Sequence, residues 1–412
     1  MNIAVMGYGV VGSGVVEVVY TNHEKLLRKT KQDAMEVKYI LDLREFPDSP
    51  YVDRFTKDFN VILNDDDVQI VVETMGGLHP AFEYVSACLA KGKHVVTSNK
   101  ELVAAKGIEL LQIAKENHVN FMFEASVGGG IPIIRPISQC LAGNEIDEIA
   151  GILNGTTNFI LTKMIREKMD FAQALKIAQE LGYAERNPAA DVEGHDTCRK
   201  ICILASLSFG KHVYPEQVHT EGITDITLED VEYACAWGGA IKLLGCSKML
   251  DNGKISAIVC PAFVPDSSQL ASVEDVFNAI LVRGNVLGDV VFYGRGAGKL
   301  PTASAVVADV IDCANHKNGG KSPSWGPGEE GYVVDYKTVE TSLYVRATAE
   351  DTEAVLHKVK QVFGDVQELT RKHMPDHELA FVTPVLPEQE IRQKLETIED
   401  LNVITTIRVT DY

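Results

Sequence analysis

A glycine-rich turn close to the N-terminus constrains the fold of this chain more than any other feature. The turn reads Gly-Tyr-Gly-Val-Val-Gly over residues 7–12, follows a short apolar run at 3–6, and precedes a helical pattern at 14–20. A G-x-G-x-x-G turn between a strand and a helix is typical of the first unit of a doubly wound α/β domain, because its glycines permit a tight turn and close backbone packing. We therefore expect the chain to begin with a parallel sheet.

The next stretch of the chain repeats the alternation of strand and helix. Apolar runs typical of strands occur at 37–41, 68–72, 94–97 and 121–124, and the last of them follows a helix that ends near Asn117. Such runs are expected of strands that are buried on both faces of a parallel sheet. The alternation predicts the α/β fold class, with an N-terminal doubly wound Rossmann domain that binds a nucleotide over residues 1–132.

Residues 133–314 predict a central domain of mixed α+β type. Helical periodicity at 157–181 is interrupted near Asp170, which can cap a second helix, and Gly182 is a stop signal. A long helix is expected at 195–209. Strand patterns occur at 254–264, 279–286 and 289–293.

The last part of the chain predicts a linker and a third domain. Residues 315–332 are rich in Gly, Pro and Ser, which is the composition of a linker. Residues 333–412 then show the order strand, helix, strand, strand, helix, strand, which is the ferredoxin-like βαββαβ pattern. Its elements are expected at 342–347, 352–362, 366–370, 378–383, 388–396 and 403–409.

The balance of charge excludes several classes of partner. The chain has 39 basic and 58 acidic side chains and a net charge of −19, whereas nucleic acids and anionic membranes attract positive charge. No apolar run reaches the roughly 18–20 residues that cross a bilayer, and the N-terminus lacks the basic segment of a signal peptide. The 8 cysteines form no C-x-x-C pair, so we expect reduced thiols in a cytoplasmic protein.

The glycine turn also predicts a bound pyridine dinucleotide. Gly9 lets the backbone approach a pyrophosphate at the N-terminus of the next helix, and the third glycine of the turn, with Gly14, allows close helix–sheet packing. The alternative is a glycine turn that binds nothing. Asp42, at the end of the second strand, favours the ribose hydroxyls of NAD, whereas Lys38 and Arg44 favour the 2′-phosphate of NADP. Both cofactors stay open on this evidence.

A charged stretch before and within the predicted helix at 195–209 predicts a substrate site. Asp196 and Lys200 are four residues apart and share a helix face, and Glu185 and Asp191 precede them in a loop. Carboxylates would accept the ammonium group of an amino-acid substrate, and Lys200 would serve as the base in alcohol oxidation if burial lowers its pKa. The alternative is an exposed ion pair at a helix start, which contributes little to stability.

Two further segments are candidates for the site. Lys100 follows the carboxyl end of the strand at 94–97, on the side where doubly wound sheets bind ligands; the alternative is a solvated lysine at a helix start. Three consecutive glycines at 128–130 expose backbone carbonyls that can bind a hard monovalent cation. The alternative there is a flexible turn between domains.

Several motifs, in order, resemble those of the homoserine dehydrogenase family, and the resemblance covers nearly the whole chain. The Asn-Gly-Thr-Thr-Asn sequence at 154–158 and the Glu-x5-Asp-x4-Asp-x3-Lys pattern from Glu185 to Lys200 are specific to that family. The other motifs are the glycine turn, VVETMGG at 71–77, HVVTSNK at 94–100, FEASVGGGIP at 123–132 and YGRGAG at 293–298.

The resemblance implies an NAD(P)-dependent oxidoreductase that interconverts L-homoserine and L-aspartate 4-semialdehyde in threonine, methionine and isoleucine biosynthesis. It implies that Lys200 is the acid and base, and that Lys100 lies between nicotinamide and substrate and assists proton transfer. The substrate-binding residues that it implies are Glu185, Asp191, Asp196, Thr156, Gly182 and Tyr183. Those that it implies for the cofactor are Gly7, Tyr8, Gly9, Val10, Val11, Gly12, Asp42, Arg44, Thr74, Ser98, Lys100 and Gly298.

The resemblance also carries expectations about a metal, assembly and regulation. It implies a structural sodium ion held by backbone oxygens of Glu124, Val127, Gly129 and Ile131. It implies a homodimer or a higher homo-oligomer formed through the central domain, which would also bind the substrate. The C-terminal βαββαβ unit resembles an ACT regulatory domain. No kinase segment precedes Met1, so we do not expect the aspartokinase fusion.

Two positions depart from the family pattern, and other functions stay under consideration. Leu41 stands where many members carry Arg or Lys, which leaves the preference for NADP open, and the turn at 349–354 lacks the Pro and Gly of an amino-acid-binding ACT turn. One alternative is another amino-acid-pathway dehydrogenase on the same fold. A semialdehyde dehydrogenase is disfavoured, because no cysteine lies in an evident catalytic motif. Retention of both lysines and the three acidic residues argues against a noncatalytic sensor.

Overall fold

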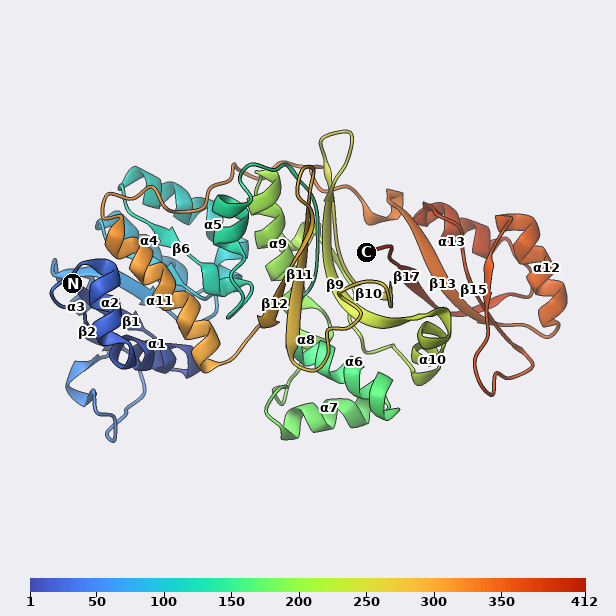
Figure 1. Cartoon of the computed structure of the whole chain (residues 1–412), viewed down its shortest axis with the longest axis horizontal. Coiled ribbons are helices and arrows are strands. Elements are labelled where there is room, and N and C mark those ends of the chain that lie inside the picture. The colour runs from blue at the N-terminus through green and yellow to red at the C-terminus, as the bar shows by residue number, and fades with distance from the viewer. The chain divides into compact units, whose positions relative to one another are not determined.

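The chain divides into two compact units, each assembled from three segments. The computed structural model describes all 412 residues, and Figure 1 shows its helices and strands. Unit 1 consists of Met1–Ile146, Cys202–Pro215 and Phe292–Glu329, and unit 2 consists of Asp147–Ile201, Glu216–Val291 and Glu330–Tyr412. Segments that are distant in the sequence therefore complete each core. The four domain and linker ranges expected from the sequence stay predictions.

Unit 1 contains the predicted doubly wound parallel sheet. Its strand order is β3-β2-β1-β4-β5-β6, and all neighbouring strands run parallel. The direction of winding reverses between β1 and β4, which is where sheets of this type bind ligands. The predicted Rossmann fold is confirmed. The strands are β1 (Asn2–Met6), β2 (Glu36–Leu41), β3 (Phe55–Thr56), β4 (Val68–Glu73), β5 (His94–Thr97) and β6 (Phe121–Met122).

The helices of unit 1 include one that returns from far along the chain. They are α1 (Val10–Thr21), α2 (His23–Thr30), η1 (Val52–Arg54), α3 (Phe59–Leu63), α4 (Ala81–Ala90), α5 (Lys100–Glu116), η2 (Glu124–Ser126), η3 (Pro136–Cys140) and α11 (Lys299–Asn315). The helix α11 was not predicted from the sequence. Its buried residues Ala303, Val306, Val307 and Val310 share a core with Val15 of α1. Their helical spacing is the signal that could have revealed this helix.

The segment after α11 has the composition of a linker but is attached to unit 1. Residues 316–329 contain no helix or strand beyond an isolated bridge between Gly326 and Lys211. Trp325, however, is 8% exposed, and its indole nitrogen donates to His212 Nδ1 at 2.9 Å. A single large aromatic side chain that finds a buried partner is enough to fix such a segment.

An eleven-stranded sheet provides most of unit 2. Nine strands follow the order β12-β11-β7-β9-β10-β17-β13-β15-β14, while β16 pairs with β13 and β8 with β10. Two of these strands, β7 and β9, were not predicted, and they join the predicted strands into one sheet. The strands are β7 (Ile146–Ile152), β8 (His219–Thr220), β9 (Gly239–Met249), β10 (Ile255–Pro265), β11 (Phe277–Gly284), β12 (Gly288–Arg295), β13 (Glu340–Thr348), β14 (Gln367–Leu369), β15 (Glu378–Val382), β16 (Leu386–Pro387) and β17 (Asn402–Val409).

The helices of unit 2 begin and end close to the predicted signals. Asp170 caps α7 by accepting from Gln173 N at 2.8 Å, and Gly182, just after this helix, has a φ of +75°. In unit 1, the strand predicted at 121–124 is wrong in part, because β6 ends at Met122 and Glu124 lies in η2. The helices are α6 (Gly155–Glu167), α7 (Phe171–Glu180), α8 (Ala189–Val192), η4 (Pro215–Gln217), α10 (Leu228–Trp237), η5 (Tyr336–Thr338), α12 (Thr352–Phe363) and α13 (Glu388–Glu396); α9 (His195–Phe209) extends across both units.

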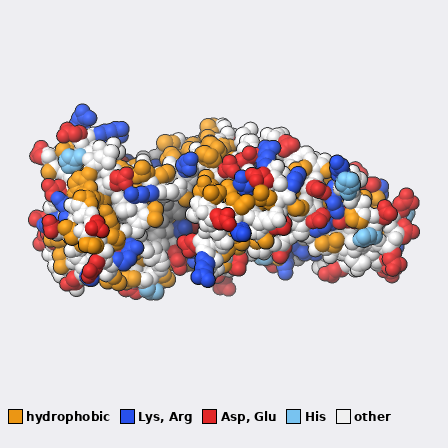
Figure 2. All heavy atoms as spheres, turned by 90° about the horizontal axis from the view of Figure 1, so that it is seen from below, with side chains coloured by type: hydrophobic (Ala, Val, Ile, Leu, Met, Phe, Trp, Pro, Cys, Tyr) orange, Lys and Arg blue, Asp and Glu red, His pale blue; other side chains and the backbone are white.

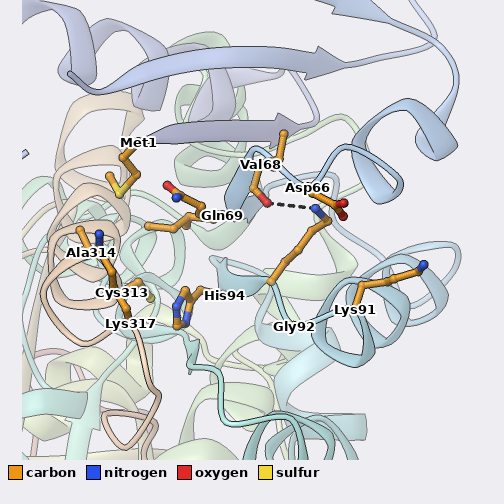
Figure 3. Close-up of a pocket in the computed structure, with 12 residues that line it drawn as sticks. Met1, Asp66, Val68, Gln69, Lys91, Gly92, His94, Cys313, Ala314 and Lys317 are labelled. Carbon is orange, nitrogen blue, oxygen red and sulfur yellow. Dashed lines mark hydrogen bonds between the residues drawn. The ribbon is translucent and has the colours of Figure 1, made fainter. Parts of the chain in front are cut away.

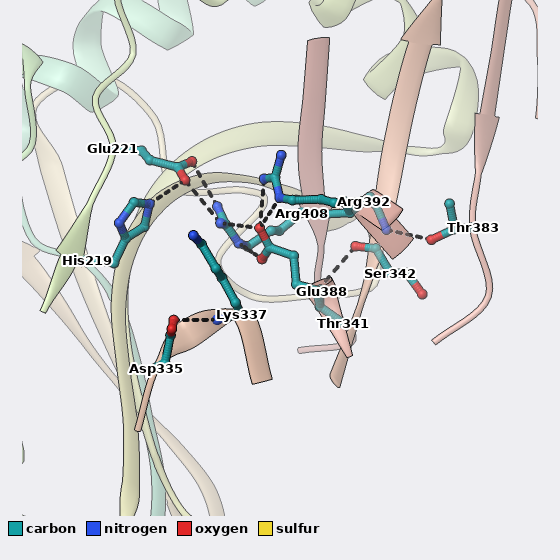
Figure 4. A network of polar contacts seen from close by, with 11 residues as sticks. His219, Glu221, Asp335, Lys337, Thr341, Ser342, Thr383, Glu388, Arg392 and Arg408 are labelled. Atoms are coloured by element: carbon teal, nitrogen blue, oxygen red, sulfur yellow. Dashed lines mark hydrogen bonds and ion pairs between the residues drawn. The ribbon is translucent and has the colours of Figure 1, made fainter. Parts of the chain in front are cut away.

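The C-terminal strands and helices have the predicted βαββαβ order. Their strand order is β17-β13-β15-β14, with α12 and α13 packed on them, as in ferredoxin-like domains. Figure 4 shows a polar network at this part of unit 2. Arg408 donates to Glu388 Oε2 and to Glu221 Oε2, both at 2.8 Å, and Arg392 donates to Glu388 Oε1 at 2.7 Å. These ion pairs connect β17 and α13 to the loop after β8.

The surface is mixed in charge. Figure 2 shows acidic and basic side chains interspersed over the face that it draws. None of the helices combines the length and the apolar composition that crossing a membrane requires.

Candidate functional site

The glycine turn of unit 1 lies at the carboxyl ends of β1 and β4. Gly7 has a φ of +93°, which favours glycine, and its amide donates to Leu41 O at 2.8 Å. A Cβ on Gly12 would lie 1.9 Å from Gly7 O and 2.7 Å from Thr74 Oγ1. No atom lies within 4 Å of the corresponding position on Gly9, the residue before α1. The first and third glycines therefore close the turn, while the second leaves its backbone open to a ligand.

Gly14 has a different role from the one expected. A Cβ at this position would lie 2.9 Å from Lys299 O and 3.1 Å from Ala303 Cβ. The predicted helix–sheet contact at Gly14 is therefore wrong, because the residue allows α1 to approach α11. Gly298, the residue that precedes α11, has a φ of +122°.

Asp42 is already occupied by protein donors. Its Oδ2 accepts from the Tyr8 amide at 2.8 Å and from Arg44 Nη2 at 2.8 Å, and its Oδ1 accepts from Arg44 Nε at 3.0 Å. The Arg44 hydrogen bonds lower the pKa of Asp42 to about 2, so the pair is charged at neutral pH. Lys38, the other basic residue proposed for a 2′-phosphate, pairs instead with Asp65 at 2.6 Å.

The predicted cofactor residues after β4 and β5 lie at the same edge of the sheet. The Thr74 hydroxyl donates to Met6 O at 3.1 Å and Gly7 O at 3.0 Å, so this side chain holds the glycine turn. Ser98 follows β5, and Lys100 is the first residue of α5. Parallel strands bring their carboxyl ends to one edge, which explains why these distant motifs meet within unit 1.

The three consecutive glycines form a close backbone contact and not a flexible turn. A Cβ on Gly129 would lie 2.2 Å from Gly296 O, and one on Gly130 would lie 2.8 Å from Pro301 Cβ. The Gly130 amide also donates to Arg295 O at 3.0 Å. The segment at 128–130 therefore packs directly against the loop that leads to Gly298.

Buried charges support this glycine segment. Glu124 is 2% exposed, and its carboxylate accepts from the amides of Ile133 at 2.6 Å and Ile134 at 2.8 Å. Arg135 forms ion pairs with Glu124 at 3.2 Å, Asp309 at 3.0 Å and Asp312 at 3.2 Å. Burial raises the pKa of Asp309 to about 8. Three carboxyl groups thus share one guanidinium in this cluster.

Lys200 and Asp196 form a buried pair in unit 2. Lys200 Nζ donates to Asp196 Oδ2 at 2.8 Å and to Leu153 O at 2.7 Å. The two side chains are 8% and 7% exposed. The alternative of an exposed helix-start ion pair is therefore wrong, because the residues before α6 cover this face of α9.

Asn154 completes the cluster, and the sequence analysis gave it no role. Its side-chain amide donates to Asp191 Oδ1 at 2.7 Å and to Asp196 Oδ2 at 2.9 Å, while its oxygen accepts from the Thr157 amide at 2.9 Å and caps α6. The first residue of the Asn-Gly-Thr-Thr-Asn motif was the available signal. Asp191 was expected in a loop, but it lies on α8.

The remaining predicted substrate residues lie at the start of α6 and in the exposed loop after α7. The Thr156 hydroxyl donates to Tyr183 O at 2.7 Å, which connects the start of α6 to the loop after α7. The Tyr183 ring packs edge-on against Phe159 at 5.0 Å between centroids. Glu185 and Gly182 are exposed. These contacts bring Thr156 and Tyr183 together, and the side chain of Glu185 faces solvent.

A cavity of about 230 Å³ lies at the opposite edge of the parallel sheet in unit 1. Figure 3 shows Met1, Val68 and His94, which precede or begin strands of the sheet, around this cavity. Lys93 lines it, is 4% exposed, and donates to Val68 O at 3.0 Å. Because it adjoins the amino ends of the strands, the cavity is separate from the glycine turn.

Comparison with known proteins identifies both parts of the site region. Two family models match, described as "Homoserine dehydrogenase" over residues 132–311 and as "Homoserine dehydrogenase, NAD binding domain" over residues 7–124. The homoserine dehydrogenase of Bacillus subtilis (strain 168) is 37% identical, with 100% of this chain and 97% of the relative covered. That of Synechocystis is 39% identical, with 99% and 98% covered.

Solved structures give the same result. The homoserine dehydrogenase of Thiobacillus denitrificans is similar with a TM-score of 0.87 and 32% identity, covering 100% of this chain and 98% of that one. The S. aureus enzyme at pH 7.5 has a TM-score of 0.84 and 34% identity, with 100% and 99% covered. A hyperthermophilic archaeal homoserine dehydrogenase in complex with NADPH has a TM-score of 0.64 and 28% identity, with 76% and 97% covered.

Proposed function

The chain belongs to the homoserine dehydrogenase family, and on this premise we propose that Lys200 is the acid and base of its reaction. Enzymes of this family are oxidoreductases with an NAD-binding domain. The observation that carries the assignment is the buried ammonium of Lys200 between Asp196 Oδ2 at 2.8 Å and Leu153 O at 2.7 Å. A buried amine with fixed acceptors is suited to exchange a proton with a substrate hydroxyl at a defined position.

The substrate role of the cluster follows from its charges. In the oxidation of L-homoserine, Lys200 in its neutral amine form accepts the hydroxyl proton and becomes an ammonium. In the reduction of L-aspartate 4-semialdehyde, the ammonium of Lys200 returns a proton to the carbonyl oxygen. Asp191 and Glu185 accept hydrogen bonds from the substrate ammonium group, while Asp196 and Asn154 orient the lysine. Thr156, Gly182 and Tyr183 shape the pocket. Lys100 assists the proton transfer from the N-terminus of α5.

The glycine turn is suited to a dinucleotide, and we propose NADP as the preferred one. When bound, the cofactor would accept or donate the hydride. Open space over Gly9 at the start of α1 suits a pyrophosphate, which the residues Gly7 to Gly12 would hold with Thr74, Ser98 and Gly298. The Asp42 carboxylate is paired with Arg44 and is therefore not available to ribose hydroxyls. The side chain of Arg44 is 63% exposed, and its guanidinium is the group that would bind a 2′-phosphate. The relative solved with NADPH agrees with this preference.

We also propose a structural sodium ion at the glycine segment. Its ligands would be backbone oxygens of Glu124, Val127, Gly129 and Ile131. The Glu124 carboxylate is not a ligand in this proposal, because it already accepts hydrogen bonds from three backbone amides. The adjacent cluster of three carboxyl groups around Arg135 provides a negative potential that favours a cation.

Three further proposals concern the oligomeric state, the regulatory role of the C-terminal elements and the cellular compartment. Val286, 80% exposed, and Leu287, 49% exposed, lie at the turn between β11 and β12, at one edge of the large sheet, and support association into a homodimer or larger oligomer. The ferredoxin-like order of the C-terminal elements supports an ACT-like regulatory role. Cys88, Cys140, Cys235, Cys246, Cys260 and Cys313 form no disulfide, which supports a reducing cytoplasm.

Turnover assays test the central proposal. Purified protein is supplied with L-homoserine and either NAD or NADP, and the absorbance of the reduced cofactor is followed. Lys200→Ala is expected to lower kcat at least 100-fold while the affinity for reduced cofactor, measured by its fluorescence, stays within about threefold. Lys176→Ala, an exposed lysine on α7, is the control. Turnover by Lys200→Ala close to that of the wild type would show that another group handles the proton.

A further inference from the structure

Glu73 is a buried carboxylate for which the proposed mechanism has no role. It is the last residue of β4 and is 0% exposed. Its hydrogen-bond partners are all uncharged: the amides of Met75 at 2.7 Å and Gly76 at 3.2 Å, and the Thr97 hydroxyl at 2.6 Å. Burial raises the pKa of this carboxyl. A carboxyl group buried away from any cation carries a desolvation cost that a purely structural site would avoid.

The contacts of Glu73 continue into the loop that carries Lys100. Glu73 and Thr97 are direct partners across β4 and β5. The Thr97 hydroxyl donates to Glu73 and accepts from the Asn99 amide at 2.9 Å. The Asn99 oxygen accepts from Leu102 N at 3.1 Å and thereby caps α5, whose first residue is Lys100.

The same network closes back on the loop after β4. The Asn99 side-chain amide donates to Gly77 O at 2.7 Å, while Glu73 holds the amides of Met75 and Gly76 in that loop. One carboxylate therefore fixes both loops at the carboxyl edge of the sheet. Gly76 and Gly77 have φ of +77° and +71°, a region that glycine adopts without strain, so the loop turns sharply between the groups that Glu73 and Asn99 hold.

We propose that Glu73 is a positioning residue, which acts through Thr97 and Asn99 to fix Lys100 and the loop at 74–77 for the reaction. The proposal rests on the proposed function, because Lys100 assists proton transfer there. Small displacements of groups that align reactants reduce rates strongly, by about 100-fold for roughly 1 Å. The network predicts that loss of the carboxylate reduces kcat through misplacement of Lys100, whereas cofactor binding at the glycine turn persists.

Hydrogen exchange tests the contacts without any need for turnover. In Glu73→Gln, an NH2 donor replaces one of the two carboxylate oxygens. The side chain can then no longer accept hydrogen bonds from both loops. Amide exchange in the protein without ligands is expected to accelerate at least tenfold at 74–77 and 98–103 and to stay unchanged in β1 and α1. Glu109→Gln, an exposed position on α5, is the matched control. Unchanged exchange in both loops of Glu73→Gln would overturn the proposal.

Kinetics then test the consequence for Lys100. Glu73→Gln is expected to lower kcat 10- to 100-fold with a KM for homoserine within about threefold, and to add less than twofold on a Lys100→Ala background. Multiplicative losses in the double variant would overturn the proposal. A wild type inactive with homoserine and both cofactors would contradict the proposed function, while the exchange result would still decide whether Glu73 holds the two loops.

A second pair of variants guards against misfolding of Glu73→Gln. Thr97→Val removes the hydroxyl that links Glu73 to Asn99, and Thr97→Ser restores it in a smaller side chain. Thr97→Val is expected to reproduce the loss in kcat and to shift the pH profile of kcat, and Thr97→Ser to recover most of both. Equal kinetics for the two variants would contradict the role of this hydroxyl.

Discussion

At the scale of single residues, the proposed cofactor preference rests on Asp42 and Arg44. An acidic residue at the end of the second strand usually binds the ribose hydroxyls of NAD. Here Asp42 accepts three hydrogen bonds from Arg44, one of them from its backbone amide, and one from the Tyr8 amide, so its oxygens are engaged. The guanidinium that neutralises it is itself exposed. The pair therefore offers a cation where NAD would require a free carboxylate.

Arg44→Ala is expected to shift the cofactor preference from NADP toward NAD. It removes the proposed phosphate ligand and frees Asp42 for ribose hydroxyls, so the KM for NADP should rise tenfold or more while that for NAD falls or stays within twofold. Steady-state kinetics with both cofactors measure the ratio. Arg28→Ala, an exposed arginine on α2, is the control. An unchanged ratio of the two KM values would exclude Arg44 as a determinant of specificity.

Lys242 is a second buried lysine, and its role concerns stability. It is 1% exposed on β9, and its ammonium donates to Val273 O at 2.5 Å and Asn158 Oδ1 at 3.3 Å. Burial lowers its pKa from 10.5 to about 8. The charged form is therefore less favourable in the folded protein than in the unfolded chain, and this penalty is fully present below pH 8.

Stability should therefore rise with pH through the titration of Lys242. Between about pH 8 and 10.5 the unfolded chain binds this proton and the folded protein has released it, so the free energy of unfolding gains about 3 kcal/mol from this group. Urea unfolding at pH 7, 8, 9 and 10 measures the slope. Lys242→Met should flatten it relative to Lys248→Met, an exposed position on the same strand. Identical slopes would contradict the lowered pKa.

At the scale of elements, one glycine before α1 and one within it have different roles, in binding and in packing. Gly14 allows α1 to contact α11, since a Cβ there would lie 2.9 Å from Lys299 O. Gly9 precedes α1 with open space over its backbone and a φ of −79°, which any residue can adopt. Two glycines five positions apart thus have different roles.

Alanine at each position is expected to give opposite results. Gly14→Ala should destabilise unit 1 by about 1–3 kcal/mol, because two helix backbones must move apart. Gly9→Ala should leave the free energy of unfolding within about 0.5 kcal/mol and weaken dinucleotide binding at least tenfold, because its methyl group enters the space for the pyrophosphate. Chemical unfolding and fluorescence titration with reduced cofactor provide the two measurements. Equal effects of both variants on stability would refute this division.

At the scale of the whole molecule, the C-terminal elements belong to the large sheet of unit 2. β17 pairs with β10 through Ala262 and Phe263, so the sheet is continuous. Asp230 of α10, 0% exposed, forms an ion pair with Arg346 of β13 at 3.0 Å and accepts from the Tyr344 hydroxyl at 3.1 Å. The C-terminal strands thus neutralise a charge that the rest of unit 2 buries.

Removal of the C-terminal elements is therefore expected to destabilise unit 2. A chain ending at Val334 exposes the edge of β10 and leaves Asp230 without its cation, at a cost of about 3–5 kcal/mol for the unpaired charge alone. Thermal unfolding and sedimentation should show a lower Tm and aggregation. Asp230→Asn in the shortened chain should recover part of the stability. A shortened chain as stable as the full one would mean that the C-terminal part folds independently.

The sequence alone determined those features that depend on neighbouring residues. The glycine turn, the Asp170 cap, the stop at Gly182 and the four-residue spacing of Asp196 and Lys200 are local patterns, and each is found in the structure. Alternation of strands and helices likewise predicted the parallel sheet, because periodicity reports which face of an element is buried. The family resemblance followed from the same local motifs.

Only the tertiary structure decided which of these groups are buried and what they contact. Asn154 reaches Asp191 across 37 positions, Trp325 reaches His212 across 113, and Arg135 reaches Asp309 across 174. The burial of Lys200 arises when distant segments pack together, and so do the partners that occupy Asp42 and those that surround Glu73. Spacing along the chain carries no record of those distances, since they depend on how sheets and helices assemble.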